Sequence, residues 1–200
     1  MARLSLTKAS LSKQKQQLKT FEDVLPSLDL KRRQISAERA KARQKLTKTQ
    51  QQLEELKSAI AKDLPMLSND LINLKGLVKV TRVDLVQENV MGTWLPKVNQ
   101  VEIEVDDYAL LSKPFWVDRL VELLRVALEA EIGLQVGQQR VKLLNQAERV
   151  ITQRFNLFDK VLIPQTQANI KKIQIYLADA ERAGVVNSKL AKRKKEKQAG

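Results

Sequence analysis

A seven-residue repeat of aliphatic side chains runs through the first 74 residues and most constrains the fold. Steps of seven from Leu4 to Leu67 meet Leu or Ile at eight of ten positions, with Arg32 and Arg39 as the exceptions. A companion set offset by three begins at Thr7. An a/d pattern sustained over this many heptads is typical of a coiled coil. It predicts one long helix that Pro26 and Pro65 should kink or break.

A second repeat follows Pro114 and extends to about Lys189, because Pro114 suits a helix start. Its two seams are Leu120, Ala127, Leu134, Val141, Glu148, Phe155 and Leu162, and Trp116, Leu123, Ala130, Gly137, Leu144, Ile151 and Phe158. Beyond Pro164 the seam slips by about one residue, to Ile170, Ile173, Leu177 and Ala180. A stutter or kink near the proline would produce such a slip.

Between the two repeats, residues 75–114 lose the helical period. Val101, Ile103 and Val105 alternate with glutamates, which is a strand pattern, and Val78 and Val80 alternate similarly. Residues 87–96 contain Asn, Gly and Pro and are read as a turn or loop. The sequence thus predicts a β-hairpin insert.

The predicted fold is mainly α: a long antiparallel two-helix coiled coil formed by N- and C-terminal helices, with a short β-hairpin between them. Neither seam can be buried by its own helix, so folding back at the insert brings them together. The expected segments are an N-terminal helix (1–74), the insert (75–114), a C-terminal helix (115–188) and a basic tail (189–200). The tail is a charge run that we expect to fray or be disordered.

The composition excludes several kinds of site. The chain has no Cys and no His, so Cys/His zinc sites, thiol nucleophiles and imidazole catalysis are absent. No Gly-x-x-x-x-Gly-Lys-Ser/Thr loop is present to bind phosphates. We therefore expect a non-enzyme without a metal or cofactor. The sequence shows neither a signal peptide nor a membrane span, which predicts a soluble, cytoplasmic protein.

Three motifs, in this order along the chain, resemble those of the D subunit of V-type ATPases. Residues 28–35 resemble the family's block of leucine, Lys-Arg and leucine, and residues 89–96 its Asn-Val-x-Gly-x-x-Leu-Pro stretch. Residues 154–164 are similar to its Arg-x-Asn-x-Leu-Glu-x-x-x-Ile-Pro block, with Asp159 near the acidic place. A following Ile-x-x-x-Leu-x-x-x-Glu-Arg pattern appears as Ile173, Leu177, Glu181 and Arg182.

The resemblance implies a central rotor shaft that transmits torque between a nucleotide-hydrolysing ring and a membrane ring moving H⁺ or Na⁺, or that runs in reverse for ATP synthesis. The implied partners are the A and B subunits, whose ring cavity would receive the helices, and the F and C (or d) subunits. The membrane would be contacted only through the complex. The suspected interface residues are Lys31, Arg32, Arg39, Asn89, Gly92, Pro96, Arg154, Asn156, Pro164, Glu181 and Arg182.

Other interpretations remain open at this point. The net charge of +13 fits an acidic partner, nucleic acid or anionic lipid. A basic coiled coil could bind nucleic acid through its tail, although few aromatic residues interleave with the cations. A holdase-like scaffold could grip clients through the insert. Arg32 and Arg39 either contact acidic bearing loops or extend out of the seam. Gly133 and Gly137 indicate close approach of the facing helix or of a partner subunit.

Overall fold

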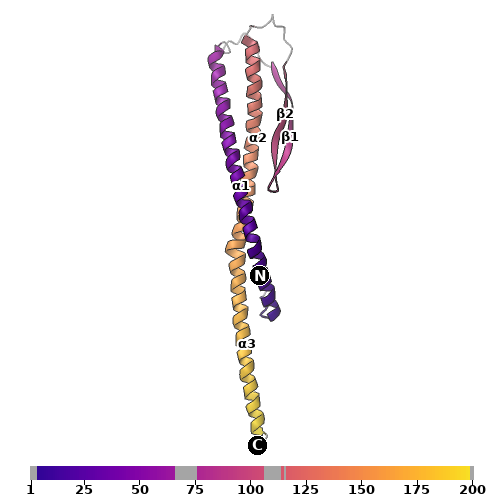
Figure 1. Cartoon of the computed structure of the whole chain (residues 1–200), viewed down its shortest axis with the longest axis vertical. Coiled ribbons are helices and arrows are strands. Elements are labelled where there is room, and N and C mark those ends of the chain that lie inside the picture. Colours follow the sequence, from indigo (N-terminus) through magenta and orange to yellow (C-terminus); the bar gives the residue numbers. More distant parts are fainter. Residues whose placement is uncertain (1–3, 66–75, 106–113, 115, 199–200) are drawn as a thin grey trace. The chain divides into compact units, whose positions relative to one another are not determined.

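The structure is a computed structural model that describes residues 4–65, 76–105, 114 and 116–198. Its elements, in chain order, are helix α1 (Lys8–Asp63), strands β1 (Val78–Val90) and β2 (Thr93–Val105), helix α2 (Trp116–Leu157), the π-helix η3 (Phe158–Leu162) and helix α3 (Ile163–Gln198) (Figure 1). This confirms the predicted mainly α fold with a hairpin between two long helices. The expected seam residue Leu67 and the expected boundary at 74/75 lie outside the described residues.

Helix α1 begins after Thr7, whose hydroxyl accepts a hydrogen bond from the Ser10 backbone N–H at 3.2 Å. This contact satisfies one of the donors left free at a helix start. The sequence predicted a kink or a break at Pro26, and of these two the break does not occur, because α1 continues through this proline. Pro26 is exposed and removes a single donor, a local loss that the surrounding turns bridge. The helix ends at Asp63, two residues before Pro65, as the sequence predicted.

The chain forms two compact units, one built from both ends of the sequence and the other from the continuous stretch between them. Unit 1 comprises Met1–Lys31 and Val150–Gly200, and unit 2 comprises Arg32–Arg149. In unit 1, Phe21 packs edge-on against Phe158 with ring centroids 5.4 Å apart, and Lys8 pairs with Glu181 at 3.2 Å. As the residue number rises along α1 from Lys8 to Phe21, the number of the contacted residue falls from Glu181 to Phe158. The helices of unit 1 therefore run antiparallel.

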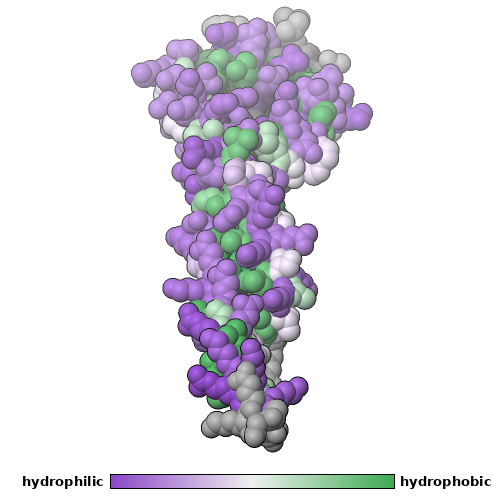
Figure 2. Space-filling view, turned by 60° about the horizontal axis from the view of Figure 1, so that its bottom comes forward, coloured by the Kyte–Doolittle hydropathy of each residue, from purple (hydrophilic) through white to green (hydrophobic). Residues whose placement is uncertain are grey.

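Unit 2 shows the same antiparallel pairing between the rest of α1 and α2. In Figure 1, α2 lies between α1 and the hairpin, and ion pairs join α2 to both neighbours. Hydrophilic residues cover most of the face drawn in Figure 2, with hydrophobic residues in patches between them. A narrow buried seam explains why so few aromatic residues suffice. The buried residues of unit 2 that lie at predicted seam positions or beside them on the same face include Ile35, Leu53, Leu64, Trp116, Leu120, Leu134 and Leu144.

A hydrophobic cluster anchors the base of the hairpin on the helices of unit 2. Val78 and Val105 from the hairpin pack against its buried centre. A two-stranded hairpin is only marginally stable in water by itself. These contacts give it the support that such a hairpin needs. The buried centre of the cluster is made of Leu64, Leu77, Trp116, Val117, Leu120 and Val121.

The turn of the hairpin is shorter than the sequence suggested. Residues 87–96 were expected to be a turn or loop, but β1 continues to Val90 and β2 begins at Thr93. Only Met91 and Gly92 form the turn, with φ of 51° and 79°. Two successive positive φ values match the tight turn whose twist suits antiparallel strands. Pro96 is accommodated within β2, where it lies opposite Gln87.

The one-residue slip of the seam coincides with the π-helix η3. The Ile163 backbone N–H donates to the Phe158 carbonyl, five residues earlier instead of four. Such a turn contains one extra residue, so every later position moves by one. The next buried positions are Thr166 and Ile173 (5% and 0% exposed), eight and fifteen residues after Phe158. The predicted slip is therefore real, and an extra residue in the helix is its cause.

The basic tail, which we expected to fray or be disordered, is drawn as a continuation of α3 to Gln198. Lys, Arg, Glu, Gln and Ala favour helix intrinsically, which explains why a charge run without packing partners adopts this conformation. All described side chains of residues 181–195 are exposed. No helix among the described residues has a stretch long and apolar enough to cross a membrane.

Candidate functional site

The candidate sites of this chain are surfaces and turns. Within the described residues, Asp and Glu side chains nowhere gather into a group of three that could hold a metal ion. The candidate residues from the sequence fall into four places: the α1 seam, the hairpin turn, the η3 region and the exposed end of α3.

Arg39 pairs across the seam of unit 2 with Glu148 on α2. The Arg39 Nη1 to Glu148 Oε2 distance is 2.5 Å, and the two side chains are 31% and 18% exposed. Both residues occupy seam positions where an aliphatic residue would normally stand. The structure thus places the Arg39 guanidinium on a carboxylate of its own chain. Its Nε is buried without a hydrogen-bond partner among the described residues.

Lys31 and Arg32 lie next to each other on α1, and both side chains are half-buried. Lys31 is the last residue of the first segment of unit 1, and Arg32 is the first residue of unit 2. The Lys-Arg pair of the first motif therefore marks the point on α1 where one packing unit gives way to the other.

The second motif builds the tip of the hairpin. The Asn89 side-chain oxygen accepts a hydrogen bond from the Gly92 backbone N–H at 2.8 Å, which closes the turn. Gly92 provides a positive φ that glycine adopts without steric cost. Leu95 is fully buried. The structure thus brings Asn89, Gly92 and Pro96 together in one hairpin.

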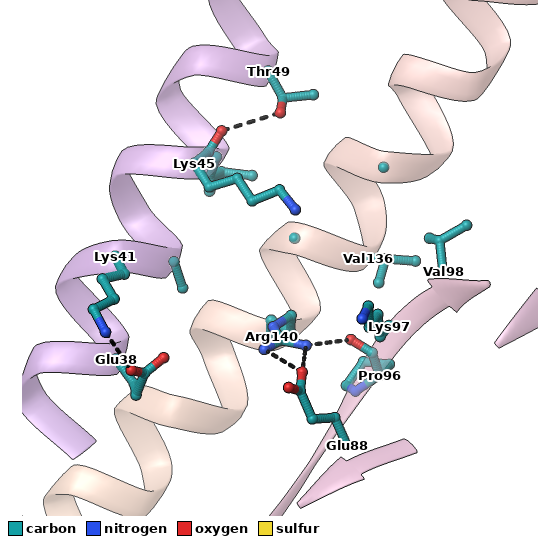
Figure 3. A pocket seen from close by; sticks show the side chains of 14 residues that line it. Glu38, Lys41, Lys45, Thr49, Glu88, Pro96, Lys97, Val98, Val136 and Arg140 are labelled. Atoms are coloured by element: carbon teal, nitrogen blue, oxygen red, sulfur yellow. Dashed lines mark hydrogen bonds and ion pairs between the residues drawn. The ribbon is translucent and has the colours of Figure 1, made fainter. Parts of the chain in front are cut away.

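Arg140 on α2 fixes this hairpin to the helices. Its guanidinium nitrogens lie 3.0 Å from Glu88 Oε2, and Nη1 also donates to the Pro96 carbonyl at 3.2 Å (Figure 3). A guanidinium suits this role because its several donors point in fixed directions. Arg140 and Glu88 are 52 residues apart. No local pattern in the sequence marks them, and the sequence analysis missed both.

The third motif surrounds η3. Arg154 is exposed near the end of α2, Asn156 is half-buried, and Pro164 is the second residue of α3. The Thr166 hydroxyl donates to the Leu162 carbonyl, two residues before Pro164, at 2.6 Å. The motif thus contains the residues that form the extra-residue turn and its proline. It belongs to unit 1, whereas the hairpin turn belongs to unit 2.

Glu181 and Arg182 lie on the exposed part of α3. Glu181 pairs with Lys8 of α1 at 3.2 Å, and Arg182 pairs with Asp179 one turn earlier at 3.7 Å. Beyond them, apolar side chains on an otherwise basic, fully exposed helix favour a partner surface. These apolar residues are Val185, Val186 and Leu190, which are 51–55% exposed.

Comparison with known proteins identifies similarity over nearly the whole chain. The family model of the ATP synthase D subunit matches residues 10–193. The D subunit of the V-type ATP synthase of Borreliella burgdorferi is 35% identical over 192 residues, covering 96% of this chain and 95% of that protein. The corresponding V-type ATP synthase D subunit of Chlamydia trachomatis serovar L2 is 31% identical over 198 residues, covering 96% of both.

Proposed function

Because the chain belongs to the family of ATP synthase D subunits, we propose that it is the central rotor shaft of a V-type ATPase. It transmits torque between a nucleotide-hydrolysing ring of A and B subunits and a membrane ring that moves H⁺ or Na⁺, in either direction of coupling. The observation that carries the proposal is the family match over residues 10–193, which spans both helices and the hairpin. Antiparallel helix pairs of this length support it, because they can carry twist along their axis.

The exposed end of α3 is the part of the shaft that we place in the ring cavity. Its described side chains from 181 to 195 are all exposed, and basic residues dominate among its charged positions. A basic helix end fits a cavity with acidic walls by charge complementarity. The exposed Val185, Val186 and Leu190 provide apolar contact area for the surrounding subunits. Among the candidate residues, Arg182 belongs to this contact, whereas Glu181 of α3 keeps its ion pair with Lys8 of α1.

The hairpin and the η3 region are the second and third contact zones in this proposal. Asn89, Gly92 and Pro96 shape the hairpin, and the F subunit and the C (or d) subunit are the partners outside the ring. The chain itself is non-catalytic and needs no cofactor. It is cytoplasmic and peripheral to the membrane, as part of the ATP-hydrolysing sector. Arg154, Asn156 and Pro164 are the suspected contacts of the η3 region, and Lys31 and Arg32 are those of α1.

Purification of the tagged full chain from its native membranes at moderate salt tests the assembly. Recovery in fixed ratio with nucleotide-hydrolysing A and B subunits and a small F-like partner is the expected result, read by mass spectrometry. Recovery with nucleic acid, or as a lone oligomer, would contradict the rotor assignment.

Truncation after Gly184 then tests torque transmission. The ion pair of Lys8 with Glu181 is retained, so the remaining helices of unit 1 keep their packing. We expect the truncated complex to assemble and to lose most ATP-driven ion transport per ATP hydrolysed. A matched control carries Lys48→Gln, Lys57→Gln and Lys62→Gln, which remove positive charge from α1 and should leave coupling intact.

A further inference from the structure

Small residues gather at one level of the helix seam in unit 2. Gly133 and Gly137 stand on α2 and Ala42 on α1, where Leu or Ile occupies other levels. A Cβ on Gly137 would come within 3.1 Å of the Leu46 Cδ1, so this glycine permits close helix approach, as the sequence predicted. A Cβ on Gly133 would meet nothing within 4 Å. The missing side chain at Gly133 therefore leaves space.

That space is part of a cavity of about 370 Å³ lined by α1, α2 and the hairpin (Figure 3). The volume lies in the range of small-molecule sites, about 300–1,000 Å³. All of the lining residues belong to unit 2. The cavity thus combines an apolar interior with walls that are fixed by one packed unit. Its apolar lining comes from all three neighbours and includes Ala42, Leu46, Pro96, Val98 and Val136.

Charged side chains surround this interior, and four of them are paired with one another. Lys41 Nζ contacts Glu38 Oε1 at 2.8 Å on α1. Arg140 contacts Glu88 at 3.0 Å and so holds the hairpin wall in place. Each of these two pairs is neutral within the lining.

Lys45 and Lys97 are the remaining cations of the lining, and neither has an ion-pair partner among the described residues. Lys45 extends from α1 toward α2 in Figure 3, while Lys97 lies on β2. Two ammonium groups that are not paired with a carboxylate lie beside an apolar cavity. Such a site is complementary to an anion that carries an apolar body.

We propose that this cavity binds a free, small amphiphilic anion. Its apolar body occupies the space beside Gly133, and its carboxylate, sulfonate or phosphate group lies at Lys45 and Lys97. The proposal is independent of the rotor assignment, because it depends only on residues of unit 2 and can be tested on the isolated full chain.

The fluorescent probe 8-anilinonaphthalene-1-sulfonate has the required chemistry, and N-phenyl-1-naphthylamine is its uncharged counterpart. Titration of the full chain should give saturable one-to-one binding of the sulfonate. Decanoate should displace it and decanol should not, whereas vesicles of anionic phospholipid should leave it bound. Displacement by vesicles and not by decanoate would overturn the assignment of a free small molecule.

Gly133→Leu fills the cavity without a backbone clash, because its Cβ has open space. We expect it to weaken binding of both probes by more than about tenfold, which corresponds to about 1.4 kcal/mol. The matched control is Gly184→Leu on α3, where a Cβ also meets nothing within 4 Å. Equal loss in the control, or unchanged binding in Gly133→Leu at an unchanged melting temperature, would overturn the site.

Lys45→Gln and Lys97→Gln test the anion contact. Each should weaken sulfonate binding roughly fivefold, the size of a partly solvated charge contact. Binding of the uncharged probe should not change. Lys48→Gln makes the same charge change on α1 outside the cavity and should have no effect. If all three variants weaken binding equally, the probe responds to net charge and the proposed anion contact is wrong.

Discussion

Arg39 and Glu148 show how a single pair can decide the register of two helices. Both lie at seam positions, and each would leave a partly buried, unpaired charge if the helices slipped by one residue. Removing one partner of such a pair is costly, whereas replacing both by apolar residues is often neutral or stabilising. The pair therefore specifies alignment more than it adds stability.

A double-mutant cycle at Arg39 and Glu148 measures this effect. Arg39→Leu or Glu148→Leu alone should lower the free energy of unfolding by about 1–3 kcal/mol, since each leaves an uncompensated charge. The double variant should return to within about 1 kcal/mol of the original chain. Urea unfolding followed by circular dichroism gives these values.

Lys41→Leu is the control, because the Lys41 ion pair with Glu38 lies on one helix face and the Lys41 side chain is 71% exposed. Its loss should change stability by less than about 0.5 kcal/mol. Additive effects of the two seam substitutions would show that Arg39 and Glu148 do not interact in solution.

At the scale of elements, the wider turn of η3 allows the helix to continue through Pro164. Proline lacks an N–H and its ring collides with the carbonyl four residues earlier in a regular helix. The wider turn at Phe158–Leu162 precedes Pro164 and moves the seam by one position. Because Thr166 and Ile173 are buried after that shift, the packing of unit 1 depends on the extra residue.

Deletion of Lys160, an exposed residue of η3, should convert the segment to a regular helix. The seam of this variant is then regularly spaced, but Pro164 lies inside a regular helix. Its free energy of unfolding should fall by about 3 kcal/mol. Combining the deletion with Pro164→Ala should restore most of that loss. Thermal unfolding monitored by circular dichroism at 222 nm compares the original chain, the Lys160 deletion, and the deletion combined with Pro164→Ala. The melting temperature should be lowest for the deletion alone.

The control for this prediction is deletion of Lys142, an exposed residue of α2 far from any proline in the sequence. This deletion shifts the seam of α2 but does not remove the extra residue of η3. Adding Pro164→Ala should therefore not restore its stability. Rescue of both deletions to the same extent would show that η3 does not act as a register correction.

At the scale of the whole molecule, stability should be distributed unevenly along α3. The part of α3 before Glu181 buries Thr166 and Ile173, whereas the described side chains from Glu181 onward are all exposed. Isolated helices shorter than about 12–15 residues are marginal in water. The end of α3 is therefore helix that a partner surface would have to stabilise.

Hydrogen exchange of the isolated chain tests this distribution. Amides of residues 185–195 should exchange with an opening free energy near zero, while those around Ile173 should be slowed by the packing of unit 1. In the assembled complex the 185–195 segment should become protected. Equal protection of both segments in the isolated chain would contradict the assignment of the segment as a partner contact.

The three family motifs also acquire physical meanings at this scale. One marks the change of packing unit on α1, one closes the hairpin with Asn89 and Gly92, and one contains η3 and Pro164. Each is a place where the chain departs from a uniform coiled coil. Motifs at such positions fix the packing of each helix or hairpin within its own unit.

The sequence by itself determined the parts of the fold that repeat locally. Its heptads predicted two long antiparallel helices and most of their buried residues, its alternating valines predicted the strands, and the slip near Pro164 predicted an irregular turn. These features depend on burial of a regular face, and regular spacing is visible in the order of residues.

Only the tertiary structure decided the contacts between distant residues. The pairing of Arg140 with Glu88, that of Arg39 with Glu148, and the cavity beside Gly133 each join elements that lie far apart in the chain. The turn of two residues also became evident only there, because pairing with β2 extends strand structure through residues that favour loops locally. Such contacts depend on which faces meet in space, and residue spacing within one element does not encode this.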